Sequence, residues 1–145
     1  MTIPLGCGHE LNLHAKMTEA EYAAFMHKVD VGLSLMYAPH PGLLALEMAS
    51  VGARVVTNTF DNRSETYLRG LSENIIPCEP TISGIKQALI EAIESLRDFS
   101  GRVSGMRVNR SPGSWSEVFN DDFFRREIGS FLGIDQLIVS EKTES

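Results

Sequence analysis

Residues 30–58 contain two apolar, β-like runs on either side of a short apolar helical pattern, and this arrangement most restricts the fold. The first run is DVGLSLMYA, and the second, ARVVTN, is rich in β-branched residues. A nearly continuous apolar run is typical of a strand that is buried on both faces of a parallel sheet. The segment between the runs predicts a helix from about Gly42 to Val51, with Gly52 as its C-terminal stop. The three segments together predict a βαβ unit.

Flanking segments extend this pattern. HELNLHAKM predicts a strand at residues 10–16. Thr18 and Glu21 form a capping-box pattern that predicts the start of a helix. The apolar face of that helix is expected to contain Tyr22, Phe25, Met26 and Val29.

After residue 58, segments with helix and strand patterns continue to alternate. The polar segment DNRSETYLRGLSE predicts a loop with a helical turn, and NIIPCEP predicts a short strand. TISGIKQALIEAIESLRDF predicts the clearest helix, capped by Thr81 or Ser83, with one apolar side made of Ile82, Ile85, Leu89, Ile93 and Leu96. This order of strands and helices predicts an α/β fold with an open parallel sheet and flanking helices.

The length of 145 residues suffices for one compact domain with a core. We expect residues 1–100 to form the sheet and its helices. Residues 101–145 are expected to be a connector, rich in Gly, Ser and Arg, and a C-terminal helix that packs on the same domain. A second capping box, Ser114 with Glu117, predicts the start of that last helix.

The charge and the cysteines exclude some classes of function. A net charge of −6 argues against general binding to nucleic acid or anionic membranes, which both need a basic surface. No segment approaches the roughly 20 apolar residues of a transmembrane helix. Cys7 and Cys78 lie far apart and have no neighbours at metal-ligand spacing, so we expect no metal site and a cytoplasmic protein.

Glu47 is the only Asp, Glu, Lys or Arg between Asp30 and Arg54. In open α/β sheets, ligands bind beyond the C-terminal ends of the strands, which is where the helix near Gly42 begins. The first amides of a helix lack internal acceptors and can bind phosphate, and a carboxylate one turn further could accept from sugar hydroxyls. The alternative is that Glu47 only pairs locally, with Arg54 or a backbone amide.

The run LEMASVG at 46–52, followed by RVV at 54–56, resembles a signature of retaining GT-B glycosyltransferases, Leu-Glu-Ala-Met-Ala-x-Gly followed by Pro-Val-Val. The APHPG loop, NTFDNRS and NIIPCEPT look similar to bacterial rhamnosyltransferases of surface-polysaccharide synthesis. The resemblance covers about residues 10–96. It implies a Rossmann-like, partial GT-B C-terminal domain that binds a nucleotide sugar. The full enzyme would transfer the sugar, rhamnose by the second likeness, to a glycan acceptor without a metal or other cofactor.

The resemblance also implies site residues. Glu47 matches the glutamate that holds the nucleotide ribose. Gly42 matches the loop glycine, so that Pro41, Gly42 and Leu43 would lie at the diphosphate. The segment that ends in Lys16 and Met17 falls where the family contacts the base.

Other features depart from the family. Pro39 stands where the family has a second glutamate for the donor sugar, so this role is vacant or passes to His40. The acceptor-binding domain, the phosphate-binding Arg and Lys and two strands of the sheet would precede Met1, so we expect the chain alone to be inactive.

Without the two strands, the strand at residues 10–16 would be separated from the other three. A rearranged sheet, a partner chain or a swapped element would have to fill the gap. Unpaired strand edges favour association, so a homo-oligomer is expected. The alternative function is that of a non-catalytic remnant or an oligomerising interaction module with a GT-B-like fold.

Overall fold

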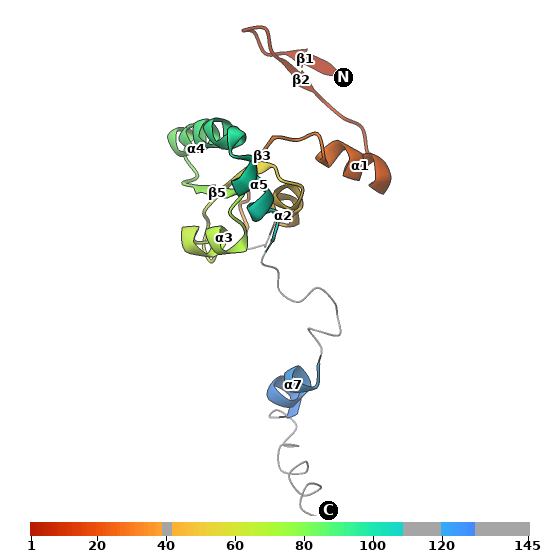
Figure 1. Cartoon of the computed structure of the whole chain (residues 1–145), viewed down its shortest axis with the longest axis vertical. Helices are drawn as coiled ribbons and strands as arrows, with labels where there is room; N and C mark the ends of the chain where they lie inside the picture. The colour runs from red at the N-terminus through yellow and green to blue at the C-terminus, as the bar shows by residue number, and fades with distance from the viewer. Residues whose placement is uncertain (39–41, 109–119, 130–145) are drawn as a thin grey trace, which may run out of the picture. The chain divides into compact units, whose positions relative to one another are not determined.

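The computed structural model describes residues 1–38, 42–108 and 120–129 (Figure 1). The chain divides into two compact units, Met1–Asn109 and Arg110–Ser145. The division that the sequence suggests at residue 100 stays a prediction. The described elements of the first unit are β1 (Thr2–Pro4), β2 (Glu10–Asn12), α1 (Glu19–Met26), β3 (Val31–Ser34), α2 (Leu43–Ser50), β4 (Arg54–Asn58), α3 (Glu65–Leu71), β5 (Ile75–Cys78), α4 (Ile82–Glu94), the 3-10 turn η1 (Ser95–Arg97) and α5 (Phe99–Gly105).

The strands β3, β4 and β5 form a parallel sheet in the order β3-β4-β5. Leu33 pairs with Val56, and Val56 pairs with Ile76 in the next strand. Every residue of β4 is buried, as expected for a central strand covered on both faces. The predicted α/β fold with an open parallel sheet is therefore confirmed.

Alternate residues of the strands face two separate apolar clusters, because successive side chains of a strand point to opposite faces. Val55 and Ile75 pack in one cluster with residues of α1, α2 and α3. Val56 and Ile76 pack in the other cluster with Ala88 and further residues of α4. The sheet thus lies between α4 on one face and the three other helices on the opposite face.

The predicted strand at residues 10–16 is not part of this sheet, in line with its expected separation from the other three strands, but its predicted length is wrong. Only Glu10–Asn12 is extended, and it pairs antiparallel with Thr2–Pro4 in a separate hairpin (Figure 1). Gly6, Cys7 and Gly8 all have positive φ angles, and the two glycines adopt them without strain. This turn lets the neighbouring segments pair locally, so β2 needs no partner in the parallel sheet.

Two helices differ from the sequence-based expectation. The polar segment expected to be a loop with a helical turn contains the seven-residue helix α3, because Ser64 caps its first turn and Leu68 is buried against the sheet. In α4, Thr81 is the cap as predicted, but small residues, Ala88 and Ala92, make the buried contact with the sheet. Ile82 and Ile93 on the expected apolar side are 89% and 59% exposed.

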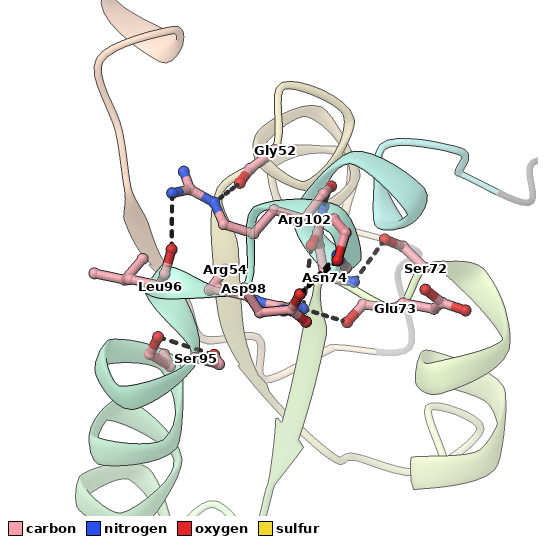
Figure 2. A network of polar contacts seen from close by, with 12 residues as sticks. Gly52, Arg54, Ser72, Glu73, Asn74, Ser95, Leu96, Asp98 and Arg102 are labelled. Carbon is pink, nitrogen blue, oxygen red and sulfur yellow. Dashed lines mark hydrogen bonds and ion pairs between the residues drawn. The ribbon is translucent and has the colours of Figure 1, made fainter.

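The first part of the expected connector is also helical, since it contains α5. A polar network at the N-terminal ends of β4 and β5 holds α5 to the sheet (Figure 2). Arg102 donates to the carbonyls of Gly52 and Leu96, and Arg54 forms an ion pair of 3.3 Å with Asp98. These contacts tie residues 98–105 to the first unit.

Asp98 gives this network a dependence on pH. Its carboxylate accepts from Gly101 N–H at 2.9 Å and from the Ser100 hydroxyl, and these bonds with nearby Arg54 hold the pKa of Asp98 below its ordinary value of 3.8. A lowered folded-state pKa stabilises the fold above about pH 4, and this stabilisation is lost as the pH falls through the folded-state pKa. We expect Asp98→Asn to lower the urea midpoint at pH 7 and to lower it by less as the pH falls below 4. An equal difference at pH 7 and below pH 4 would contradict this role.

The second unit is described over residues 120–129. It contains α7 (Asp121–Phe123) and the π-helical turn η2 (Phe124–Gly129), and the Asn120 side chain caps α7 by accepting from Phe123 N–H at 2.8 Å. The predicted cap at Ser114 and Glu117 lies outside the described residues. Within the described part of the chain, no helix has the length and apolar character to cross a membrane.

Candidate functional site

Helix α2 begins at Gly42, which follows β3 at the C-terminal edge of the parallel sheet. Gly42 is the N-cap and has a φ of 71° and a ψ of 73°, a left-handed conformation that favours glycine. Its carbonyl accepts from Ala45 N–H at 3.2 Å. The first N–H groups of a helix have no intrahelical acceptor and carry the positive end of its dipole, so the start of α2 is suited to an anion.

A buried arginine adds positive charge at this point. Arg63, in the loop after β4, is only 1% exposed, and its Nη2 donates to Thr57 Oγ1 at 2.8 Å. Its Nη1 lies against Gly42, where a Cβ on residue 42 would stand 2.6 Å away. Burial lowers the pKa of the Arg63 guanidinium, yet arginine stays protonated at neutral pH. Gly42 is thus required both by its φ angle and by the close approach of Arg63.

Glu47 lies on the second turn of α2 and is half-buried. Its Oε2 accepts from the Tyr22 hydroxyl of α1 at 2.8 Å. Partial burial, with the neighbouring carboxylate, raises the pKa of the Tyr22 phenol. The alternative pairing of Glu47 with Arg54 does not occur, because Arg54 donates to Glu73, Asn74 and Asp98 at the opposite end of β4.

An open pocket of about 450 Å³ lies beside Tyr22. It is bounded by the segment before α1 and by the first turns of α1, and its lining is mainly apolar. The rings of His14 and Phe25 approach to 4.9 Å at this pocket. Met17 contributes to the lining, whereas Lys16 is exposed and does not. A planar apolar group, such as an aromatic base, fits a lining of this kind.

A second, smaller pocket of about 220 Å³ lies at the ends of β3 and β4 and is lined by Met36, Asn58, Ile85 and their neighbours. Asn58 is buried and fixes the chain after β3, since its side chain accepts from Met36 N–H at 2.7 Å and donates to Met36 O at 2.9 Å. These two bonds give Asn58 a structural role at the end of β4.

The structure brings together part of the predicted site. Gly42, Leu43 and Glu47 lie along α2, and the Tyr22 hydrogen bond joins Glu47 to the pocket that Met17 lines. His40 and Pro41 lie outside the described residues, as does Pro39. Lys16 precedes the pocket residue Met17 in the sequence but does not line the pocket.

Sequence reasoning missed two residues of this region. Tyr22 was assigned only to the apolar face of α1, although a tyrosine on such a face carries a polar hydroxyl that needs a partner. Arg63 was not considered, although it is the first cation after the strand end at residue 58. A lone cation at the C-terminal end of a parallel strand was the signal that could have found it.

Comparisons with known proteins show to which family the chain belongs. Over 94 residues, or 63% of this chain, the sequence is 39% identical to the O-antigen biosynthesis protein RfbC of Myxococcus xanthus. The chain spans only 7% of the length of that relative. The family model described as "WsaF, C-terminal domain" matches residues 1–90, which include every described element from β1 to β5 and the start of α4. These matches confirm the expected relationship to a glycosyltransferase C-terminal domain of polysaccharide biosynthesis, and the chain belongs to the WsaF C-terminal domain family.

Proposed function

We propose that this chain is the donor-binding part of a glycosyltransferase with the GT-B arrangement. In the proposed complex, the amides at the start of α2 bind the diphosphate of a nucleotide sugar, and Arg63 adds positive charge behind them. Glu47 accepts from the ribose, and the pocket at Met17 and Tyr22 takes the base. His40 and Pro41, beside Gly42, complete the diphosphate end of the site in this proposal.

The observation that carries this proposal is the placement of Glu47. Glu47 lies on α2, little more than one turn from the start of the helix at Gly42, and its hydrogen-bond partner Tyr22 lines the apolar pocket. A diphosphate, a sugar hydroxyl and a base follow one another in a nucleoside diphosphate in the same order. A carboxylate that only pairs with a neighbouring residue would not need a helix start on one side and an apolar pocket on the other.

The proposed reaction transfers the sugar from the nucleoside diphosphate to a hydroxyl of a glycan. The chain would contribute by positioning the donor and by stabilising the negative charge that develops on the leaving diphosphate. No metal or other cofactor is required in this proposal, because backbone amides and Arg63 supply the positive charge. The relationship to RfbC, whose name refers to O-antigen biosynthesis, supports a surface polysaccharide as the acceptor and, with the sequence likeness, rhamnose as the sugar.

Glu47→Gln tests the proposal. We expect the wild-type chain to bind at least one of dTDP, UDP and GDP at millimolar concentration, as measured by ligand-observed NMR. The variant should bind it about tenfold more weakly, because a neutral amide accepts a sugar hydroxyl less strongly than a carboxylate does. Glu91→Gln, an exposed glutamate on α4, is the matched control and should bind as the wild type does.

The same titration decides the alternative function, an oligomerising interaction module without a nucleotide site. The apolar side chains that remain exposed on β3 and α4, among them Leu33 at 47% and Ile82 at 89%, favour this alternative. It predicts that none of the three nucleotides binds the wild type and that Glu47→Gln changes nothing. Binding that weakens only in Glu47→Gln would exclude it.

A further inference from the structure

We propose that Tyr37 and the smaller pocket beside it bind one neutral sugar ring, which stacks on the aromatic ring of Tyr37. This pocket of about 220 Å³ lies at the C-terminal ends of β3 and β4, the edge at which open α/β sheets bind ligands. The part of this sugar in a transfer reaction rests on the proposed function, whereas its binding depends on this pocket alone.

Tyr37 offers an aromatic surface to a ligand. It follows β3 and lines the pocket, yet its side chain is 92% exposed. The half-buried ring of Phe60, in the loop after β4, lies against it with 5.0 Å between the ring centroids. Burial of aromatic surface is favourable, so an exposed ring that is supported from one side is suited to contact a ligand on another.

The lining of the pocket indicates the chemical class of this ligand. Among the described residues, the lining consists of uncharged side chains, namely Leu35, Met36, Tyr37, Asn58, Pro80 and Ile85. A phosphate would meet no cation there, whereas a sugar ring has C–H groups on its faces that match the negative face of an aromatic ring. The volume is below the roughly 300 Å³ at which pockets for drug-sized ligands begin, so it suits a single ring.

Asn58 supplies a polar group for the hydroxyls at the edge of such a ring. Its Oδ1 accepts from Met36 N–H at 2.7 Å, and a carbonyl oxygen can accept a second hydrogen bond. Its Nδ2 donates to Met36 O at 2.9 Å, so the amide is held in a fixed orientation. The pocket therefore combines an apolar stacking surface with an oriented acceptor, as an amphipathic sugar requires.

The pocket adjoins the start of α2. A Cβ on residue 42 would stand 3.6 Å from Cγ of Met36, which lines the pocket. Phe60 and Arg63 exchange two backbone hydrogen bonds, so the turn that supports Tyr37 also places Arg63 against Gly42. A sugar on Tyr37 would thus lie next to the diphosphate end of the proposed donor site. The acceptor glycan and the transferred sugar of the donor can both supply a ring of this chemistry.

Methyl glycosides of rhamnose, glucose and galactose test the proposal by ligand-observed NMR, because they carry neither a phosphate nor a base. We expect the wild-type chain to bind at least one of them at millimolar concentration. Tyr37→Ala should bind it about tenfold more weakly, since the stacking surface is lost. Tyr37→Phe keeps the ring and should retain most of the binding.

Phe99→Ala is the matched control, and it should bind the glycoside as the wild type does. It removes a ring that is 71% exposed on α5, at the opposite end of the strands. Thermal unfolding shows that each variant is folded. Tyr37→Ala should also leave the binding of dTDP, UDP or GDP unchanged, which separates the loss of a sugar contact from a general disturbance of the fold.

Loss of glycoside binding in Tyr37→Ala and not in Phe99→Ala supports the proposal. It is overturned if the wild type binds none of the glycosides, or if Tyr37→Ala binds them equally well. Nucleotide binding in the same experiments would leave the proposed function intact, and Tyr37-dependent glycoside binding without nucleotide binding would overturn only the proposed function.

The glucose conjugate of the nucleotide that binds distinguishes the two sources of the sugar, and both results support the pocket as a sugar site. Displacement of the glycoside by the conjugate, but not by the bare nucleotide, identifies the sugar of the donor. Simultaneous binding of the conjugate and the glycoside identifies the acceptor glycan.

Discussion

Asn74→Leu is expected to lower the free energy of unfolding by about 3–5 kcal/mol, which is a large part of the stability of a small domain. Asn74 is fully buried at the start of β5. Its Nδ2 donates to Ala49 O at 3.1 Å and to Arg102 O at 2.9 Å, and its Oδ1 accepts from Arg54 at 3.2 Å. One amide therefore joins α2, β4 and α5.

Leucine has a similar volume, so the loss comes mainly from polar groups and not from a cavity. The Arg102 carbonyl and one guanidinium N–H would lose their partner in a region that excludes water, while Ala49 O would keep its bond from Gly52 N–H. Each unsatisfied group costs about 1–3 kcal/mol. Urea unfolding followed by circular dichroism measures the effect. Asn12→Leu is the control, because Asn12 is exposed and its side chain accepts from the Thr2 hydroxyl at the surface. A loss below about 1 kcal/mol for Asn74→Leu would show that water replaces the amide.

Gly105→Ala is expected to destabilise the chain by about 2–3 kcal/mol, even though alanine forms helices more readily than glycine does. Gly105 is the last residue of α5 and is buried against Asn74. A Cβ on residue 105 would stand 2.5 Å from Asn74 Cγ and 2.8 Å from Asn74 N, so the backbone of α5 or of β5 would have to move. Such a shift would also disturb the hydrogen bond from the Ser72 hydroxyl to Gly105 O.

Gly70→Ala is the matched control within a helix. Gly70 lies in α3, and a Cβ there meets no heavy atom within 4 Å. This substitution should raise stability by about 0.5–1 kcal/mol, the ordinary preference of a helix for alanine. Opposite signs for the two variants in urea unfolding are the expected result. Equal effects would mean that packing against Asn74 does not limit the position of α5.

Local patterns in the sequence predicted several elements because their stabilising contacts are local too. The capping box of Thr18 and Glu21 forms as expected, with Glu21 N–H donating to Thr18 Oγ1 at 3.3 Å. Gly42 caps the N-terminus of α2, and Gly52, with a φ of 88°, follows its C-terminal cap Val51. Such caps depend on residues three or four positions apart, so a single sequence suffices to find them.

Non-local pairing accounts for the elements that the sequence pattern placed wrongly. The alternating segment around Glu10 has the pattern of a strand, but this periodicity does not indicate which strand it pairs with. The turn at Gly6–Gly8 allows it to pair with Thr2–Pro4. The apolar side of α4 reads as a core face, and Ile85 and Leu89 do pack against the cluster at the sheet. The fully buried contacts are made by Ala88 and Ala92, because small residues allow a close approach. Both outcomes depend on contacts between distant segments.

The candidate site likewise combines residues that the sequence pattern predicts with contacts that depend on the tertiary structure. The sequence by itself identified Gly42 and Glu47, because a glycine before an apolar helical pattern and a single carboxylate within that pattern can be recognised from residue types alone. It also identified the related family. Only the tertiary structure decided that Tyr22 occupies one oxygen of Glu47 and that Arg63 lies against Gly42. These contacts join residues 25 and 21 positions apart, and such distances close only when the helices pack on the sheet and bury the groups that need a partner.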